Sequence, residues 1–157
     1  MDARTSATNT DLFAVRLVNG SIIPMNGPTT QPTGLTVATP NPLYVQGDYN
    51  IGPGGSTTPG TTDTSRTYPA SLVSDALTLL SGNWQDSQSQ LAITDGSKSK
   101  ARDMIVNAAI LTGTVYSTDA TSNHFSGGVM NLPRLLEDWT GVTLTLNFQT
   151  KTPANHG

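Results

Sequence analysis

The sequence predicts a strand-dominated α+β fold. The expected core is an irregular parallel β-sheet or a β-solenoid-like stack, with two short helices at residues 69–81 and 131–139. Three observations predict it. The apolar runs are short and rich in β-branched residues, which favours strands. Long connections separate these runs, as parallel strands require. Two segments instead place their apolar residues at helical spacing.

Four runs carry the strand prediction. "LFAVRLVNGSIIPM" predicts two strands joined at Asn19 and Gly20, because Asn-Gly between apolar residues is the strongest short hairpin signal. "LTVATPNPLYVQGDYNI" predicts two more, divided by Pro40 and Pro42, which exclude a central antiparallel ladder. "MIVNAAILTGTVY" predicts a strand buried on both faces, with a helix as the alternative. "VTLTLNFQT" alternates apolar and polar residues, as a strand with one buried face does.

The connections are polar and rich in glycine, proline, serine and threonine. Residues 52–67, "GPGGSTTPGTTDTSRT", predict a long loop. "QDSQSQLAITDGSKSK" predicts a polar linker with one weak strand at residues 91–94, and "STDATSNHFSGG" predicts another loop. A long loop inside a compact domain is either mobile or functional.

The first helix is predicted over residues 69–81. Pro69 suits a first helical position and Gly82 a position just past the end. Five apolar residues between them recur at helical spacing and form one face: Leu72, Val73, Ala76, Leu77 and Leu80.

The second helix, at residues 131–139, lies in "SGGVMNLPRLLEDW". Its apolar residues fall at i, i+3, i+4 and i+7 and form one face: Leu132, Leu135, Leu136 and Trp139. Arg134 then has Glu137 and Asp138 at i+3 and i+4, as on a solvated helix face. The alternative is that Arg134 and Glu137 are partly buried and organise a polar pocket.

Length and composition limit the classes of protein to which this chain can belong. A chain of 157 residues predicts one domain, at residues 11–150, between flexible segments at 1–10 and 151–157. Charged residues make up 12% of the chain and the net charge is −3, with no basic stripe, so a nucleic-acid partner is not expected. No apolar run predicts a membrane span, and residues near Met1 lack the apolar core of a signal peptide.

The candidate catalytic residues are few. The chain has no cysteine, which excludes disulfides and thiolate sites, and none of the H-E-x-x-H, P-loop, G-x-G-x-x-G or G-x-S-x-G motifs. If the protein is an enzyme, a metal-dependent hydrolase of small esters or phosphoesters fits best, since a metal-bound water needs few other groups. The candidates for catalysis are Asp48, Asp75, His124, Arg134 and Glu137.

A divalent metal, Ca²⁺, Mg²⁺ or Zn²⁺, is the cofactor that this alternative requires. Asp48 and Asn50 in "GDYN" lie at i and i+2, where a turn can direct both side chains inward, and Asp75 is the third candidate ligand. Carboxylate and amide oxygens suit Ca²⁺ and Mg²⁺. The competing interpretation is an ordinary turn, in which Asp48 and Asn50 bond to nearby backbone.

Four segments in order resemble a family of bacterial secreted and surface proteins, many of which carry an N-terminal pilin-like (PilX-type) membrane segment. The segments are "GLTVATPNPLYVQGDYN", "YPASLVSDALTLLSGNW", "ARDMIVNAAILTGTV" and "SGGVMNLPRLLEDW", from Gly34 to Trp139. The resemblance implies an extracytoplasmic location, in the periplasm, at the cell surface or secreted. The chain departs from the family pattern at both ends, so we expect it to be part of a longer protein.

Three functions follow from these observations. The first, which we favour, is a non-catalytic structural or adhesive domain of a bacterial envelope or pilus-associated protein. The second is the metal-dependent hydrolase. The third is a glycan-binding module that uses Trp84, Trp139 or Tyr49 as a stacking platform. An exposed strand edge is expected to pair with a second copy, as a homodimer, or with the missing part of the parent protein.

Overall fold

A computed structural model describes residues 13–24, 33–113 and 134–147 of the chain. Within these residues the fold is dominated by strands, as predicted, and the only helical segment is the 3-10 helix Asp86–Gln88. No helix in this part of the chain is long and apolar enough to cross a membrane. The predicted flexible ends, the loop that contains His124 and residues 131–133 lie outside the described residues.

The strands of the described residues form three sheets, and each pairing among them is parallel. The first sheet, which we call sheet A, contains in spatial order β1 (Val15–Val18), β3 (Leu43–Gln46), β5 (Leu77–Leu80) and β8 (Arg134–Leu135). Sheet B contains β2 (Leu35–Thr39), β4 (Ala70–Ser74) and β7 (Ala109–Leu111). Sheet C contains β6 (Met104–Asn107) and β9 (Leu144–Asn147), and Tyr49 adds a bridge to Val106.

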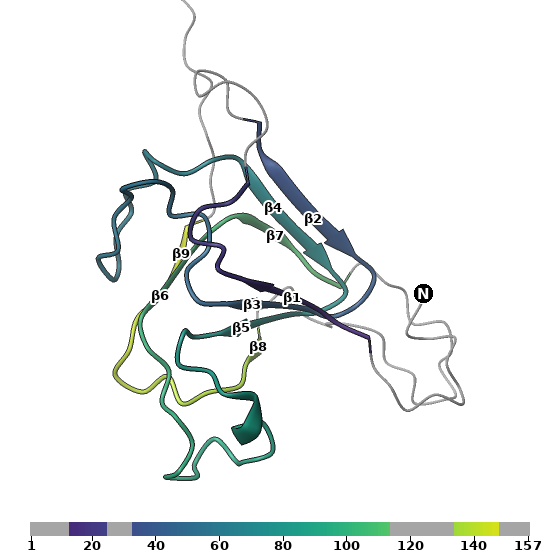
Figure 1. Cartoon of the computed structure of the whole chain (residues 1–157), viewed down its shortest axis with the longest axis vertical. Helices are drawn as coiled ribbons and strands as arrows, with labels where there is room; N and C mark the ends of the chain where they lie inside the picture. Colours follow the sequence, from purple (N-terminus) through teal and green to yellow (C-terminus); the bar gives the residue numbers. More distant parts are fainter. Residues whose placement is uncertain (1–12, 25–32, 114–133, 148–157) are drawn as a thin grey trace, which may run out of the picture.

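The chain passes through the sheets in a recurring order. After β3 in sheet A it reaches the Tyr49 bridge of sheet C and then β4 in sheet B. After β5 it reaches β6 and then β7, in the same sequence of sheets. The three sheets lie as the sides of a triangle (Figure 1). Each return places a strand directly beside its predecessor, so long connections produce parallel neighbours.

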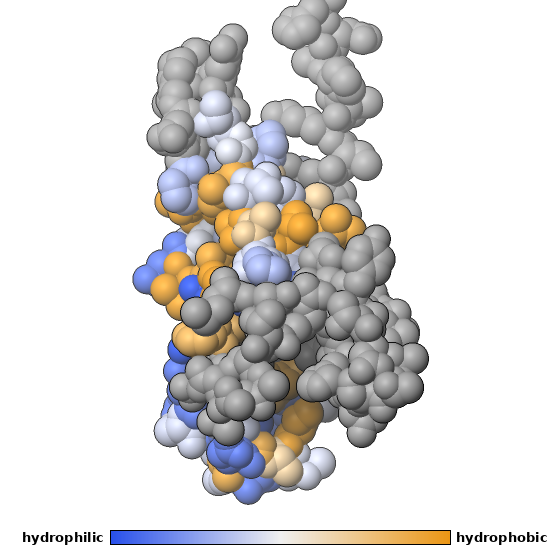
Figure 2. All heavy atoms as spheres, turned by 90° about the vertical axis from the view of Figure 1, so that its right-hand side faces the viewer, coloured by the Kyte–Doolittle hydropathy of each residue, from blue (hydrophilic) through white to orange (hydrophobic). Residues whose placement is uncertain are grey.

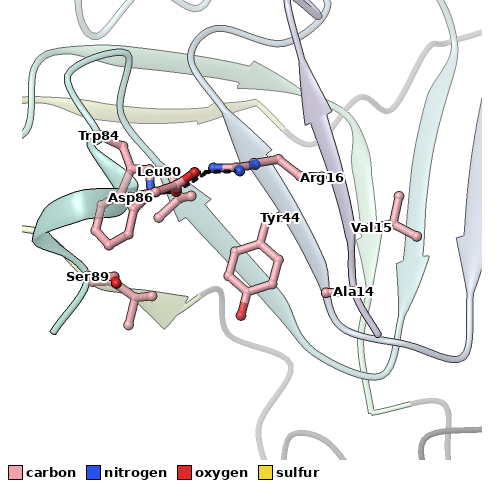
Figure 3. A pocket seen from close by; sticks show the side chains of 9 residues that line it. Ala14, Val15, Arg16, Tyr44, Leu80, Trp84, Asp86 and Ser89 are labelled. Atoms are coloured by element: carbon pink, nitrogen blue, oxygen red, sulfur yellow. Dashed lines mark hydrogen bonds and ion pairs between the residues drawn. The ribbon is translucent and has the colours of Figure 1, made fainter. Parts of the chain in front are cut away.

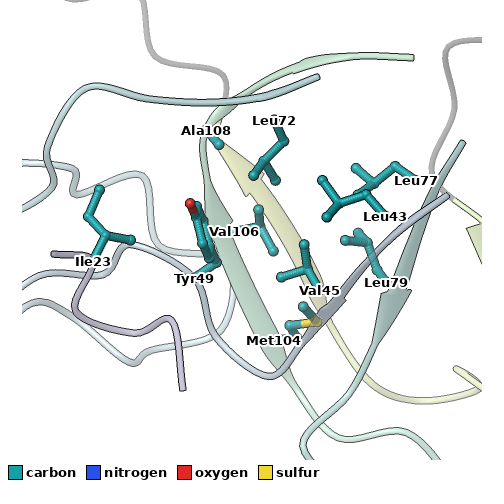
Figure 4. Close-up of a cluster of buried hydrophobic side chains, with 10 residues drawn as sticks. All are labelled: Ile23, Leu43, Val45, Tyr49, Leu72, Leu77, Leu79, Met104, Val106 and Ala108. Atoms are coloured by element: carbon teal, nitrogen blue, oxygen red, sulfur yellow. The ribbon is translucent and has the colours of Figure 1, made fainter. Parts of the chain in front are cut away.

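The core fills the space between the three sheets. Inward-facing side chains from strands of all three sheets pack into one cluster (Figure 4). Its buried members are Ile23, Leu43, Val45, Tyr49, Leu72, Leu77, Leu79, Met104, Val106 and Ala108. On the face shown in Figure 2, apolar and polar side chains are interleaved over the described residues. The parallel strand core predicted from the sequence is therefore present.

The helix predicted at residues 69–81 is wrong. This segment forms β4 and β5, which lie in different sheets and are separated by a corner at Asp75 and Ala76. The corner shifts the inward-facing positions, so Leu72 before it and Leu77 after it both enter the core. Because the corner interrupts the alternation of the two short strands, their apolar residues fall at the spacing that one helix would have. Parallel pairing on both sides of each strand outweighs the weak local preference for helix.

The helix predicted at residues 131–139 is also wrong over its described part. Arg134 and Leu135 form β8 beside Thr78 and Leu79, and Asp138 forms an isolated bridge with Lys100. The extended backbone here forms its hydrogen bonds with neighbouring segments, whereas a helix would form them within itself.

Two smaller predictions also fail. The hairpin at Asn19 and Gly20 does not form, because β1 pairs in parallel with β3. Gly20 instead lies against the ring of Tyr49, where an added Cβ would come within 2.5 Å of the ring. The weak strand at residues 91–94 forms turns. The loop predicted at 52–67 is confirmed, as it contains no strand.

Candidate functional site

Asp48 lies in the turn that connects sheet A to sheet C. Gly47 precedes it with φ +76°, a conformation that glycine adopts without strain, and donates its N–H to Leu80 O at 2.9 Å. Asp48 Oδ1 accepts a hydrogen bond from the Ile105 N–H at 2.9 Å. The carboxylate therefore ties the turn after β3 to the neighbouring strand β6.

A polar cavity of about 320 Å³ adjoins Asp48. Its lining is Val18, Asn19, Ser21, Gln46, Gly47, Asp48 and Gly82. It contains one carboxylate and no histidine, so it offers few ligands for a metal.

Asn50 is fully buried and forms hydrogen bonds across the base of the long loop at residues 52–67. It has φ +57°, a left-handed conformation that asparagine tolerates better than most residues. Its Nδ2 donates to Tyr68 O at 2.7 Å, and its Oδ1 accepts from Tyr68 N at 3.1 Å. The amide thus pairs with the Tyr68 backbone as a strand would, and it joins the two ends of loop 52–67. It is not presented to solvent as a metal ligand.

Asn50 is the first of three stacked asparagines. Asn107 lies beside it in β6 and donates Nδ2 to Asn50 O at 3.0 Å, while Asn50 Nδ2 donates to Asn107 O at 2.7 Å. Asn147 pairs with Asn107 in β9 and donates Nδ2 to Asn107 Oδ1 at 2.9 Å. It also donates to Thr61 O at 3.0 Å. These bonds connect three parallel segments that neighbour one another in sheet C: the turn after β3, β6 and β9. We call these residues the asparagine stack.

Asp75 is separated from Asp48. Leu77, two residues after Asp75, pairs with Leu43 at the start of β3, whereas Asp48 follows the end of β3. The two carboxylates therefore lie toward opposite ends of the sheet A strands. Asp75 is nearly buried, and its backbone oxygen accepts from the Gly113 N–H at 2.9 Å. Among the described residues, no three His, Cys, Asp or Glu side chains form a group that could hold a metal.

Glu137 is buried at 3% exposure, against the expectation of a solvated face. Both carboxylate oxygens accept hydrogen bonds from Ser81, Oε2 from the backbone N–H at 2.5 Å and Oε1 from the hydroxyl at 2.7 Å. Asp138 beside it lies near Lys100, at 3.9 Å, and accepts from the Thr140 N–H. Glu137 is therefore buried, as the alternative prediction expects, whereas the wider claim of a polar pocket organised with Arg134 stays a prediction. The other residue of that alternative, Arg134, contributes its backbone to β8.

The three candidate stacking platforms differ in exposure. Tyr49 is 2% exposed and belongs to the core, and burial raises the pKa of its hydroxyl. Trp139 packs against the core cluster. Trp84 is half-buried, as Trp139 is, but it lines a second cavity, which makes it the strongest candidate platform of the three.

This second cavity, of about 360 Å³, lies on the outer face of sheet A. No sequence motif indicates it. Tyr44 and Leu80 come from β3 and β5, and the segment after β5 supplies Trp84 and Asp86 (Figure 3). The rest of the lining is Ala14, Val15, Arg16, Ser89 and Leu136. We call this cavity the outer pocket.

An ion pair with two parallel hydrogen bonds borders the outer pocket. Arg16 Nη1 and Nη2 donate to Asp86 Oδ1 and Oδ2 at 2.7 and 2.8 Å, and Trp84 Nε1 donates to Asp86 Oδ1 at 2.7 Å. The bonds from Arg16 and Trp84 lower the pKa of Asp86 to about 2, and the same carboxylate raises the pKa of Arg16. The Trp84 ring is also fixed by Lys98, whose Nζ lies 5.5 Å from its centroid.

Comparison with known proteins assigns no function to either cavity. No family model matches the chain, and neither a curated protein nor a solved structure does.

Proposed function

We propose that this chain is a non-catalytic structural or adhesive domain, built as a segment of a three-sided β-solenoid. The recurring order of sheets A, C and B and the uniform parallel pairing support the solenoid. In such a fold each level covers the one before it, and stability is distributed along the stack.

One observation carries the functional part of the proposal. Three of the candidates for chemistry form structural hydrogen bonds between neighbouring parallel segments: Asp48 with Ile105, Asn50 with Asn107, and Glu137 with Ser81. Asn50 also bonds to Tyr68 across loop 52–67. A catalytic carboxylate must reach a substrate or a metal-bound water. Carboxylates whose oxygens accept backbone N–H bonds instead fix the chain. The arrangement supports a scaffold.

The ends of the stack supply a second part of the proposal. Within the described residues, β1 pairs only with β3 and β8 only with β5, so each has one side without a strand partner. An open edge can accept a further strand. We propose that such an edge joins the domain to a second copy or to another part of an extracytoplasmic parent protein. Light scattering over a range of protein concentrations tests the first arrangement, and a strictly monomeric chain would contradict it.

Turnover measurements test the absence of catalysis. The purified protein is incubated with p-nitrophenyl acetate and p-nitrophenyl phosphate, with Ca²⁺, Mg²⁺ or Zn²⁺ and separately with EDTA. We expect no hydrolysis above the buffer rate under any condition, and a melting temperature that EDTA leaves unchanged. Metal-dependent hydrolysis that disappears with EDTA and in a folded Asp48→Ala variant would contradict the proposal and support the hydrolase.

A further inference from the structure

We propose that the outer pocket binds a neutral saccharide of one or two sugar rings. The inference deepens the adhesive role proposed above and rests on it for its biological purpose. Its evidence is the geometry of the pocket, which is independent of the solenoid.

Two aromatic rings line the outer pocket. Leu80 lies between Trp84 and Tyr44 in the pocket, with the ion pair along one side (Figure 3). Trp84 and Tyr44 are both partly exposed, while Leu80 is buried beneath them. Aromatic rings with an apolar body and a polar tip suit ligands that present both C–H and O–H groups. Sugar rings are ligands of this kind.

Charge in the outer pocket is balanced. Arg16 is neutralised by Asp86, and Lys98 donates Nζ to Leu91 O at 2.9 Å beside the Trp84 ring. The outer pocket is lined by one cation and one anion, paired with each other. A site for phosphate or another anion needs uncompensated positive charge or a set of free backbone N–H groups. The balance of charge here favours a neutral ligand.

The ion pair retains hydrogen-bonding capacity. Arginine carries five N–H donors, and a carboxylate has about four acceptor positions. Two of the Arg16 donors bind Asp86, whose carboxylate accepts three bonds from the described part of the chain, two from Arg16 and one from Trp84. The side chains of Arg16 and Asp86 are 39% and 66% exposed, so a ligand in the outer pocket can reach the ion pair. Adjacent hydroxyl groups, each both donor and acceptor, complement this pattern.

The size of the pocket limits the ligand. Its volume of about 360 Å³ lies at the small end of the range for ligand sites, about 300–1,000 Å³. One or two rings fit within it, and a longer chain would extend over the surface beyond Tyr44 or Ser89.

The experiment measures binding of free disaccharides to the full chain. Maltose, cellobiose, lactose and N,N′-diacetylchitobiose are titrated at millimolar concentration, with saturation-transfer NMR and calorimetry as readouts, and inorganic phosphate is titrated as the anionic comparison. We expect at least one neutral disaccharide to bind and phosphate not to bind. Tyr44→Ala and Trp84→Ala should each weaken binding about tenfold or more, since truncating a central aromatic contact commonly has this effect.

Asp86→Ala and Asp95→Ala form a matched pair. Both aspartates are exposed residues of the segment after β5, and hydrogen bonds lower the pKa of each, but only Asp86 lines the pocket. We expect Asp86→Ala to weaken binding and Asp95→Ala to leave it unchanged. If Trp84→Ala does not fold, Tyr44→Ser provides the same test from a strand position.

Three results would overturn the inference: no binding of any of the neutral disaccharides, binding of phosphate alone, or disaccharide binding that the folded Tyr44 and Asp86 variants retain in full. Hydrolysis of the p-nitrophenyl substrates would overturn the proposed scaffold function and would not alter these binding results, so the two failures are distinguishable.

Discussion

Asn107 and Asn50 exchange hydrogen bonds between their side chains and each other's backbone. Asn107 Nδ2 donates to Asn50 O at 3.0 Å, and Asn50 Nδ2 donates to Asn107 O at 2.7 Å. Both side chains are almost completely buried, at 2% and 0% exposure. The pair connects sheet C to the turn after β3, and it holds polar groups in the interior without leaving them unpaired.

Replacing Asn107 by Ala should lower the free energy of unfolding by about 2–4 kcal/mol, because Asn50 O and the Asn147 amide then each lose a buried partner. Asn107→Asp should cost at least as much, since a carboxylate cannot donate and its charge is costly to bury. Urea unfolding measures both.

Asn83→Ala is the matched control for the asparagine stack. Asn83 is exposed, and its amide donates to Lys100 O at 3.2 Å. The loss should stay below about 1 kcal/mol. Equal losses at positions 83 and 107 would show that the asparagine stack adds nothing to stability.

Glu137 and Asp138 are adjacent acids, and we expect their replacement to destabilise the fold to different extents. Glu137→Ala removes the acceptor for both donors of buried Ser81, and we expect a loss of about 2–4 kcal/mol. Asp138→Ala breaks a 3.9 Å ion pair and one bond to Thr140, both screened by solvent, so we expect a much smaller loss than for Glu137→Ala. Denaturant titration of the two variants compares them, and a larger loss for Asp138 would contradict the assignment.

Asp86 should make the stability of the fold depend on pH in the acidic range. Its pKa in the folded state is lowered to about 2 from an ordinary value near 3.8, through the bonds from Arg16 and Trp84. A lowered folded pKa stabilises the fold above the unfolded value, and this contribution is lost as pH falls from about 4 to about 2. Thermal melts across this range should show a decrease that is smaller in Asp86→Asn. Exposure and salt screening keep the effect small. Identical pH profiles would contradict it.

Strands whose apolar residues alternate within the strand itself could be predicted from the sequence. β2 and β3 coincide with the two pieces predicted on either side of Pro40 and Pro42, and β9 lies within the alternating "VTLTLNFQT". These segments need only local information, because period two identifies one buried face. The segment at β4 and β5 could not be assigned in this way, since the corner at Asp75 breaks the period.

The candidate site was only partly predictable. Asp48 and Glu137 attracted attention because acids are scarce in this chain, and both are indeed engaged, but as acceptors for backbone N–H groups. A sequence does not show which distant N–H needs a partner. The competing interpretation placed Asp48 and Asn50 in a turn bonded to its own backbone, whereas both side chains bond to the backbone of residues distant in sequence. The signal for Asn107 and Asn147 was an asparagine inside each predicted strand, where asparagine is disfavoured.

The outer pocket could not be predicted, because its ion pair joins residues 70 positions apart. Arg16 meets Asp86 only after β1, β3 and β5 pair in register and the segment after β5 folds back over their outer face. The local feature that accompanies the pocket is a leucine on the outward side of β5, Leu80, and only the structure shows that it is buried there.

The measurement that tests the central claim most directly is the unfolding free energy of Asp48→Ala and Asp48→Asn, each with Ca²⁺ and with EDTA. If Asp48 is an acceptor for the Ile105 N–H, Asn retains that oxygen. We then predict a loss of about 1–2 kcal/mol for Ala, less than half of that for Asn, and no effect of Ca²⁺ or EDTA on the wild type or on either variant. Equal losses in both variants that occur only with Ca²⁺ present would show that Asp48 is a metal ligand, and would contradict the structural role.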